Sequence, residues 1–247
     1  MSVANLRVKI FADGADENGI REIAKKPFIA GFTTNPTLMR KAGVVDYKAF
    51  ARTVLTVIGA RPISFEVFSD DFSEMEDQAL EIASWAENVF VKIPVTNTKG
   101  EPTDALIDRL ARAGVRQNVT ALMTVEQVAR VSAVLGAKVP SFISVFAGRV
   151  ADTGRDPLPI MRAALETMTP RPNQGLIWAS PRELLNVVQA SEIGCHVITV
   201  TNDILAKLNL LGKDLDGYSL DTVKMFFNDA KAAGFSLATT LRMKRPA

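Results

Sequence analysis

Short apolar runs alternate with longer amphipathic segments along the chain, and this alternation predicts strands that are each followed by a helix. The predicted strands are residues 8–12, 29–33, 63–67, 89–93, 116–120, 142–146, 176–179 and 197–200. The helical patterns cover residues 17–25, 47–58, 71–86, 103–113, 125–135, 157–167, 181–191 and 203–210. Strict alternation indicates parallel strands joined by crossover helices, and eight such units close into an α/β fold, the (β/α)8 TIM barrel.

An additional helical pattern at residues 220–233 exceeds what a barrel needs. It could cover a barrel end or dock on a neighbouring subunit. Because no Ser- or Gly-rich linker divides the chain, we expect a single barrel domain over residues 1–247. The alternative fold is an open doubly wound sheet, but no glycine-rich dinucleotide fingerprint follows the first predicted strand.

Composition narrows the classes of partner. The 29 Lys and Arg nearly balance the 27 Asp and Glu, which argues against a nucleic-acid-binding protein. The longest stretch without a charged side chain, residues 27–39, is too short to span a membrane. The first residues lack the apolar core of a secretory signal, and the single cysteine, Cys195, cannot form an internal disulfide. These features predict a cytoplasmic protein with neither nucleic acid nor membrane as partner.

The histidine count bears on metal chemistry. A single histidine, His196, excludes most His-based metal clusters, so we expect no metal site. Cys195 and His196 precede the last predicted strand, at the end away from the expected site, and are interpreted as structural. The sequence therefore directs attention to lysine and carboxylate chemistry.

Lys92 is the strongest single candidate for catalysis. Val89, Val91 and Ile93 share one face of the fourth strand and should pack under the helices, which turns Lys92 into the barrel. A buried ammonium is costly unless it is paired or used. An amine attacks only when neutral, and burial favours that form, so Lys92 is a Schiff-base candidate. The alternative is a lysine held in a salt bridge.

Two carboxylates lie at neighbouring strand ends. Asp13 follows the first strand, and Glu66 points inward from the third because Phe65 and Val67 take its other face. A buried glutamate is rarely left unpaired. Glu66 could simply pair with Lys92, and it could also act as an acid–base group beside an imine.

Side chains on the fifth and sixth predicted strands are also expected to point into the barrel, and most of them are polar. Asn118 and Thr120 are two residues apart, and Ser144 and Phe146 repeat this spacing before Arg149. Barrel interiors are ordinarily dominated by Val, Ile and Leu. The polar groups therefore predict a site for a polyhydroxylated ligand.

The segment after the seventh strand has the pattern of a helix start. Ser180 fits an N-cap, Pro181 the first helical position and Glu183 the third. A helix N-terminus also binds anions, and barrels often hold phosphate near the seventh and eighth strands. Arg182, with Arg149 from the preceding loop, could complete such a site, which predicts a sugar phosphate as ligand.

Together these residues resemble the transaldolase family of class I aldolases. The matching segments run in order from Asp13 to Arg182 on seven of the eight predicted strands. They are Phe11-Ala-Asp13, Gly31-Phe-Thr-Thr-Asn-Pro-Thr37, Phe65-Glu-Val67, Val91-Lys-Ile-Pro94, Asn118-Val-Thr120, Ser144-Val-Phe-Ala-Gly-Arg149 and Ala179-Ser-Pro-Arg182.

The resemblance implies a cofactor-independent enzyme of the pentose phosphate pathway. It would transfer a dihydroxyacetone unit from fructose 6-phosphate or sedoheptulose 7-phosphate to erythrose 4-phosphate or glyceraldehyde 3-phosphate. Lys92 would form an imine with the C2 ketone, and Asp13 would take the proton of the C4 hydroxyl. Glu66 and Thr120 would hold the water that relays protons. The resemblance assigns substrate binding to Asn35, Asn118, Ser144, Phe146, Arg149, Ser180 and Arg182.

Two features bear on specificity within this resemblance. Pro181 stands where the family suggests an aromatic residue, which alters the wall of the phosphate pocket. Fructose-6-phosphate aldolases, which release free dihydroxyacetone, tend to carry Gln and Tyr at the positions of Glu66 and Phe146. The residues here favour transaldolase, and the aldolase is the alternative.

A hypothesis from another class is a non-catalytic barrel that binds sugar phosphates. It would need Arg149, Ser180 and Arg182 but gives no reason for Lys92. The resemblance to compact relatives that form rings also implies a homo-oligomer.

Overall fold

A computed structural model describes residues 2–237 of the chain. These residues divide into two compact units, one from Ser2 to Asn209 and one from Leu210 onward, and each is described by itself. That residues 1–247 form a single domain stays a prediction.

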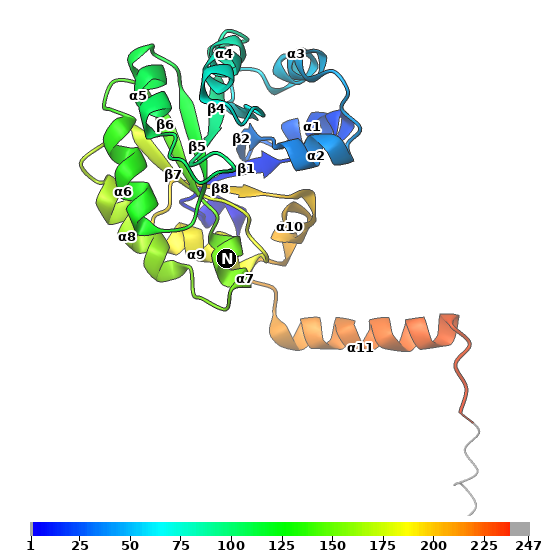
Figure 1. The fold of residues 1–247 in the computed structure, drawn as a ribbon. Coiled ribbons are helices and arrows are strands. Elements are labelled where there is room, and N and C mark those ends of the chain that lie inside the picture. Colours follow the sequence, from blue (N-terminus) through cyan, green and yellow to red (C-terminus); the bar gives the residue numbers. More distant parts are fainter. Residues whose placement is uncertain (1, 238–247) are drawn as a thin grey trace, which may run out of the picture. The chain divides into compact units, whose positions relative to one another are not determined.

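Within the described residues, eight parallel strands close into a barrel in chain order, which confirms the predicted TIM-barrel fold (Figure 1). The strands are β1 (Lys9–Asp13), β2 (Ile29–Thr33), β3 (Ile63–Glu66), β4 (Val89–Pro94), β5 (Gln117–Leu122), β6 (Ser141–Val145), β7 (Gln174–Trp178) and β8 (Val197–Val200). Each predicted strand overlaps one of these. The closing pair is β1 with β8, in which Phe11 lies opposite Thr199.

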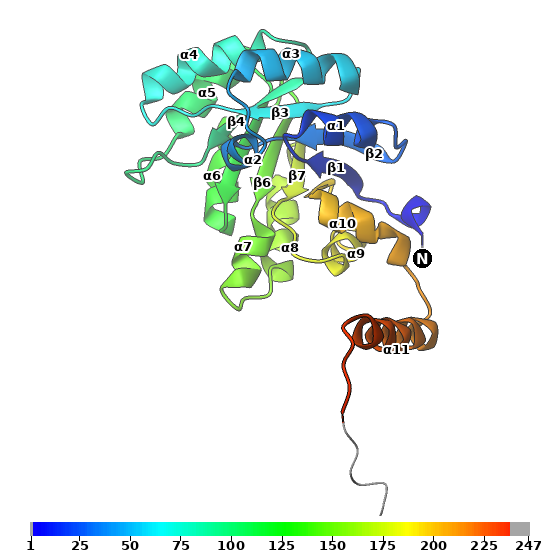
Figure 2. The ribbon, with the colours of Figure 1, turned by 90° about the vertical axis from the view of Figure 1, so that its right-hand side faces the viewer.

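Helices surround the barrel (Figures 1 and 2). They are α1 (Glu17–Ala24), α2 (Pro36–Lys41), α3 (Tyr47–Ile58), α4 (Phe72–Ala83), α5 (Asp104–Arg112), α6 (Val125–Val134), α7 (Ala147–Asp152), α8 (Leu158–Met168), α9 (Leu185–Glu192) and α10 (Asn202–Ala206), with the 3-10 turns η1 (Val3–Asn5) and η2 (Lys207–Leu210). Several begin at a side chain that accepts a backbone hydrogen bond, which satisfies an otherwise orphaned amide. Asp16, Asp46, Asp71 and Thr124 do this for α1, α3, α4 and α6.

Two short helices, α2 and α7, are absent from the sequence-based predictions. Each has six residues, too few to show a helical repeat of apolar positions. α2 begins directly after β2, with Asn35 as N-cap and Pro36 in the first turn. Both helices follow a strand at its carboxyl end, so they lie at the end of the barrel where a site is expected.

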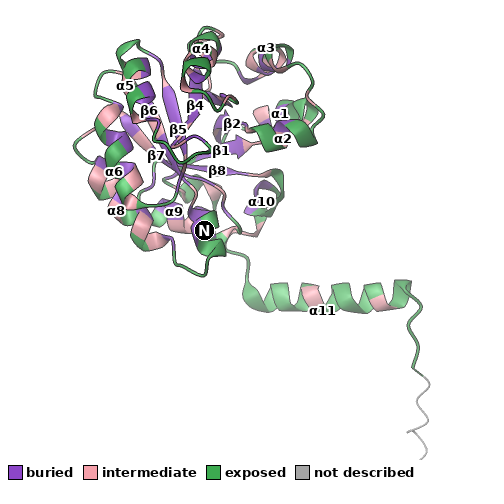
Figure 3. Ribbon diagram, in the orientation of Figure 1, coloured by how far each residue is buried: buried purple, intermediate pink, exposed green. Residues whose placement is uncertain are grey.

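Alternation of side chains along the strands separates two layers. Val89, Val91 and Ile93 are at most 3% exposed and face the helices, as predicted, which turns Lys92 inward. The strands are buried over nearly their whole length, while the surrounding helices bury only one side (Figure 3). At the amino-terminal end, Phe11 and Phe142 pack edge to face with ring centroids 5.7 Å apart. These rings fill the barrel below the polar layer.

The second unit contains the predicted C-terminal helix, α11 (Leu215–Ala232), which begins five residues before the expected start. Asp214 caps it by accepting a hydrogen bond from the Gly217 amide at 2.7 Å. Within its described residues none is buried, and its exposed apolar side chains include Val223, Phe226 and Phe227.

Candidate active site

A cavity of about 600 Å³ opens at the carboxyl ends of the strands. All the residues predicted for the site line it: Asp13, Asn35, Glu66, Lys92, Asn118, Thr120, Ser144, Phe146, Arg149, Ser180 and Arg182. These residues come from β1, β3, β4, β5 and β6 and from the segments that follow β2, β6 and β7. The fold thus gathers into one place residues that are spread over most of the chain.

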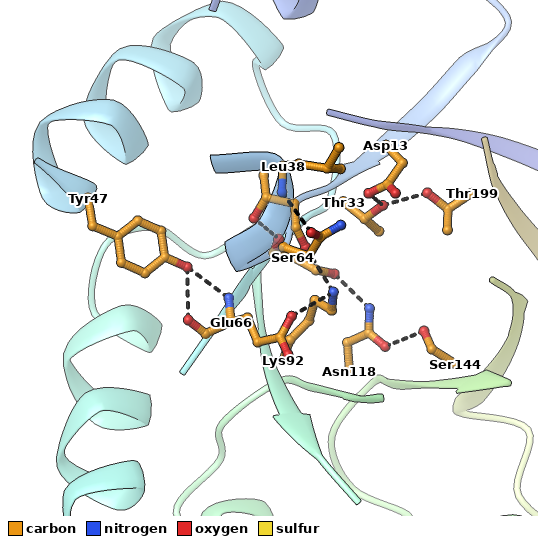
Figure 4. Close-up of polar contacts among 12 residues, drawn as sticks. Asp13, Thr33, Leu38, Tyr47, Ser64, Glu66, Lys92, Asn118, Ser144 and Thr199 are labelled. Atoms are coloured by element: carbon orange, nitrogen blue, oxygen red, sulfur yellow. Dashed lines mark hydrogen bonds and ion pairs between the residues drawn. The ribbon is translucent and has the colours of Figure 1, made fainter. Parts of the chain in front are cut away.

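Lys92 lines this cavity and is 6% exposed. Its Nζ lies 3.0 Å from Glu66 Oε2 and donates a hydrogen bond to the Thr34 carbonyl oxygen at 2.8 Å (Figure 4). The register of the barrel accounts for the pairing, because Lys92 in β4 is directly opposite Glu66 in β3. The ion pair expected from the sequence is therefore present, and it offers the buried ammonium a carboxylate to which it can pass a proton.

Tyr47, at the start of α3, fixes the backbone of Glu66. Its hydroxyl accepts a hydrogen bond from the Glu66 amide at 2.8 Å and donates one to the Glu66 carbonyl oxygen at 3.0 Å. Burial raises the pKa of Tyr47, so the phenol keeps the proton that it donates. Its ring packs edge to face against Phe65 and Trp85. The carboxylate that meets Lys92 thus stands on a backbone held from two elements.

Asp13 belongs to a chain of hydroxyl groups on the other side of the cavity. Thr33 Oγ1 donates to Asp13 Oδ1 at 2.8 Å, and Thr199 Oγ1 lies in hydrogen-bond contact with Thr33 Oγ1 (Figure 4). Burial raises the pKa of Asp13 above its ordinary value, while the charge of Lys92 and the Thr33 hydrogen bond oppose that rise. A carboxylate held in this way suits a group that takes up a proton and gives it back.

A second polar chain crosses three strands through Asn118. Its Nδ2 donates to Ser64 Oγ at 2.9 Å, and its Oδ1 accepts from Ser144 Oγ at 2.7 Å. Both ends of the amide are thereby oriented. Thr120, two residues on, is 2% exposed, and its Oγ1 has no hydrogen-bond partner within residues 2–237. A buried hydroxyl at the cavity wall without a partner is suited to hold a water or a ligand oxygen.

The backbone of β5 is irregular just beyond Thr120. The pairing of β5 with β6 shifts between Val119 and Leu122, and Ala121 has φ 67°, in the left-handed region. Left-handed conformations are unfavourable for residues with a Cβ and cluster at functional sites. Ala121 itself lines the cavity, so this strain lies at its wall.

Asn35 caps α2 and lines the cavity. Its Oδ1 accepts a hydrogen bond from the Leu38 amide at 2.9 Å. With Oδ1 engaged in this way, the Nδ2 amide hydrogens are the groups that Asn35 can best offer to a ligand. The cap therefore fixes the amide's orientation.

The segment from Ser180 to Glu183 differs from the predicted helix start. α9 begins at Leu185, and Ser180 has φ 57°, in the left-handed region, so Ser180 is not an N-cap and Pro181 is not a first helical residue. The reason lies in Asn186, whose Oδ1 accepts hydrogen bonds from the amides of Arg182 and Glu183 at 2.8 and 3.3 Å. These bonds hold the segment that precedes the helix. The prediction that a helix N-terminus at Ser180 binds phosphate is therefore wrong, because α9 begins at Leu185.

The two segments that carry the arginines, α7 and the loop after β7, are packed tightly together. A Cβ added to Gly148 in α7 would come within 1.5 Å of the Ser180 carbonyl oxygen. Arg149 is exposed, and its guanidinium lies 5.9 Å from the centre of the Phe146 ring. Arg182 Nε donates to Asp152 Oδ1 at 3.0 Å, so Arg182 is oriented by a carboxylate. Two guanidinium groups at one rim of the cavity can bind an anion such as phosphate.

Sequence reasoning missed several residues that shape the cavity. Thr33, Ser64 and Thr199 are strand residues whose side chains point into the barrel. The alternation that identified Lys92 could therefore have identified them. Tyr47 and Asp152 come from helices, where no strand phase marks them. The part of the chain that the structure describes has no group of three or more His, Cys, Asp and Glu placed to hold a metal ion.

Cys195 and His196 lie outside this cavity. Burial raises the pKa of the Cys195 thiol to about 12, and His196 Nδ1 accepts a hydrogen bond from the Leu176 amide at 3.0 Å. The Cys195 thiol also contacts the barrel backbone, at the Leu176 carbonyl oxygen. Among residues 2–237, no helix combines the length and apolar character needed to cross a membrane.

The fold and the cavity together define a (β/α)8 barrel with a lysine and carboxylates at the carboxyl ends of its strands. Residues 10–245 match the family model described as Transaldolase/Fructose-6-phosphate aldolase. The chain belongs to this family, which confirms the resemblance drawn from its motifs.

Relatives agree with this placement, and a solved structure agrees with the fold. "Probable transaldolase" of Dehalococcoides mccartyi is 35% identical over 202 residues, which cover 81% of this chain and 90% of the relative. "Probable transaldolase 2" of Listeria monocytogenes is 31% identical over 221 residues, which cover 87% and 95%. The crystal structure of 2,3-dimethylmalate lyase superposes with a TM-score of 0.53 at 14% identity, covering 98% of this chain and 89% of that one. This last similarity concerns the fold alone.

Proposed function

We propose that the protein is a transaldolase that acts through a Schiff base on Lys92. The observation that carries the proposal is the position of the Lys92 amine, buried in the strand-end cavity and 3.0 Å from the Glu66 carboxylate. Its donor would be fructose 6-phosphate or sedoheptulose 7-phosphate, and its acceptor erythrose 4-phosphate or glyceraldehyde 3-phosphate. The pentose phosphate pathway and the cytoplasm are the proposed setting.

Imine formation needs a neutral amine and a way to remove water. Lys92 passes a proton to Glu66, and its Nζ then attacks the C2 ketone to give a carbinolamine. The C2 oxygen leaves as water after protonation through Glu66, and the nitrogen keeps one proton as the iminium. Thr120, whose hydroxyl lacks a partner among the described residues, holds the relaying water between Glu66 and the C2 oxygen.

Cleavage and transfer use Asp13. The Asp13 carboxylate takes the proton from the C4 hydroxyl, the C3–C4 bond breaks, and its electron pair moves to the iminium nitrogen to give an enamine. The released aldose phosphate departs, and C3 of the enamine attacks the aldehyde carbon of the acceptor. Asp13 returns its proton to the new alkoxide, and water then hydrolyses the imine to regenerate Lys92.

The remaining groups of the cavity bind the sugar. Asn118, oriented by Ser64 and Ser144, and Asn35, oriented as an N-cap, present fixed hydrogen-bonding groups to hydroxyls. Arg149, Arg182 and Ser180, which shares the segment after β7 with Arg182, hold the phosphate. Phe146 lies under the Arg149 guanidinium and forms the adjoining wall.

The test is a coupled assay with fructose 6-phosphate, run with and without erythrose 4-phosphate, together with borohydride reduction. A transaldolase turns over efficiently only with the acceptor, and borohydride traps a three-carbon adduct on Lys92. Rapid release of free dihydroxyacetone without acceptor would instead identify a fructose-6-phosphate aldolase. Binding of sugar phosphate with neither adduct nor turnover would identify a non-catalytic barrel.

We also propose that the protein forms a homo-oligomer. Within α11, Val223, Phe226 and Phe227 are each at least 60% exposed. Apolar surface of this kind on a helix is favourable only when another surface covers it. A second copy of the chain is the proposed cover.

A further inference from the structure

Thr199, in the last strand of the barrel, is connected to Asp13 through one intervening hydroxyl. Thr33 Oγ1 is 2.8 Å from Asp13 Oδ1 and in contact with Thr199 Oγ1. An ionised carboxylate can only accept hydrogen bonds, so the single hydroxyl hydrogen of Thr33 points to Asp13. Thr33 Oγ1 must then accept from Thr199, and the chain has one direction, from Thr199 through Thr33 to Asp13.

The barrel register brings these groups together from three adjacent strands. β1 lies between β2 and β8, with Asp13 opposite Thr33 and Phe11 opposite Thr199. Thr33 and Thr199 are 3% and 6% exposed, so water competes little for their hydroxyls. Both are β-branched residues with restricted side-chain rotation in a strand, which limits the directions that their hydroxyls can take.

We propose that Thr199 is a positioning residue for the proton transfers of Asp13. By donating to Thr33 it orders the hydrogen bond that holds Asp13 Oδ1, and it leaves Oδ2 as the oxygen that meets the C4 hydroxyl of the substrate. This role rests on the proposed function, because it concerns the cleavage and transfer steps assigned there to Asp13.

The effect of the chain on Asp13 is electrostatic. A hydroxyl that itself accepts a hydrogen bond becomes a stronger donor, so Thr199 strengthens the bond from Thr33 to the carboxylate. The Thr33 bond favours the ionised form of Asp13 and works against burial. Loss of the Thr199 hydroxyl should therefore shift Asp13 toward its protonated form and weaken it as a proton acceptor.

Other charged groups face Asp13 from the surrounding elements and stay in place when Thr199 is changed. Lys92 in β4 favours the charged form of Asp13, and Glu66 in β3 opposes it. The cavities that Asp13 lines also include the charged side chains Asp16, Lys41, Arg149, Arg182 and Asp203. A change in the titration of Asp13 when Thr199 is replaced would thus be caused by loss of the hydrogen bond from Thr199 to Thr33.

The test compares Thr199→Val, which keeps the shape but removes the hydroxyl, with Thr199→Ser, which keeps the hydroxyl. Thr199→Val should lower kcat for cleavage about tenfold and move the acid limb of its pH profile up by about 0.5–1 unit. Borohydride trapping of total imine on Lys92, six-carbon and three-carbon together, should match the wild type, because formation of the imine does not use Asp13. Thr199→Ser should restore the acid limb, and Thr199→Ala offers a second deletion of the hydroxyl.

The matched control is Thr167→Val on α8, where the hydroxyl donates to the Ala163 carbonyl oxygen at 2.8 Å on an outer helix. The titration of the Asp13 carboxyl is followed by carbon-13 NMR, with its signal assigned from Asp13→Asn. An unchanged Asp13 titration and acid limb in Thr199→Val would overturn the proposal, as would a Thr199→Ser protein that behaves like Thr199→Val. A wild type that neither traps an adduct nor turns over would instead refute the proposed function, and the NMR titration would still decide whether Thr199 acts on Asp13.

Discussion

Lys92 Nζ lies 3.0 Å from Glu66 Oε2, so an amine in β4 and a carboxylate in β3 form an ion pair inside the barrel. The pair has two consequences. It solvates a charge that burial would otherwise penalise, and it gives the amine a proton acceptor at contact distance. Stability and the proposed nucleophilic attack therefore depend on the same two side chains.

Replacing the lysine should separate these consequences. Lys92→Met removes the nucleophile, and we expect cleavage of fructose 6-phosphate to fall at least about 10³-fold with no borohydride adduct. Glu66 is left partly buried without its partner, which should lower the free energy of unfolding by about 1–3 kcal/mol. Adding Glu66→Gln should recover most of that stability in urea titrations without restoring activity. A Lys92→Met protein with normal turnover would exclude the imine mechanism.

Replacing Asp13 should have opposite effects on activity and stability. Because burial raises its folded pKa above the ordinary value of 3.8, the folded state binds this proton more tightly than the unfolded chain does. The associated stability is complete below the unfolded pKa and is lost as the pH rises through the raised folded pKa. At pH 7 the ionised carboxylate therefore opposes folding.

Asp13→Asn should raise the unfolding midpoint at pH 7 by about 2–4 °C, the shift that 1 kcal/mol produces in a chain of this size. It should also slow cleavage about 10²–10⁴-fold, because an amide cannot take the C4 proton. Thermal unfolding at pH 7 and pH 5 checks the sign, since the gain should shrink as the pH falls. A lower midpoint at pH 7 would contradict the expected cost of the buried charge.

Arg149 should discriminate phosphorylated from unphosphorylated substrates. Its guanidinium is exposed at the rim of the cavity. A hydrogen bond to a charged group contributes about 1.5–3 kcal/mol. Arg149→Ala should therefore raise KM for fructose 6-phosphate about 10–100-fold and leave KM for an unphosphorylated ketose unchanged. Arg155→Ala is the control, because Arg155 is also exposed and its Nη1 contacts Thr153 rather than the cavity. Equal losses on both substrates would show a role other than phosphate binding.

The exposed apolar side chains of α11 should determine the assembly state. We expect light scattering to give a mass above that of the 26.8 kDa chain. Phe226→Glu combined with Phe227→Glu should shift the protein toward the monomer, since charged groups would then enter the proposed contact. Lys224→Glu, also on α11, changes charge without removing apolar surface and should leave the assembly intact. A wild-type protein whose mass by light scattering is that of the monomer would contradict the homo-oligomer proposal.

The sequence predicts the barrel well because strand residues obey a strict two-residue alternation. That rule turns Lys92, Glu66, Asn118 and Thr120 inward, and the structure places all four around one cavity. The rule extends equally to Thr199. The alternation pattern can therefore identify functional side chains on strands, although Thr33, Ser64 and Thr199 are not among the predicted site residues.

Other parts of the site depend on contacts between residues distant in the chain. The Thr34 contact with Lys92 is made by a backbone carbonyl, which no residue type reveals. Serine is a residue type that often caps helices, but at this position the Asn186 side chain accepts the hydrogen bonds of the Arg182 and Glu183 amides, which a Ser180 cap would otherwise accept. Tertiary contacts of this kind determine the conformation of the loops, and they cannot be predicted from the local sequence.

The close approach of Gly148 to the Ser180 carbonyl oxygen has a consequence for how substrate range can be altered. A loop after β6 that carries any residue other than glycine at position 148 would displace the loop after β7. Redesign of the acceptor or donor range should therefore graft both loops together as one cassette, and combinatorial libraries should vary their residues in pairs.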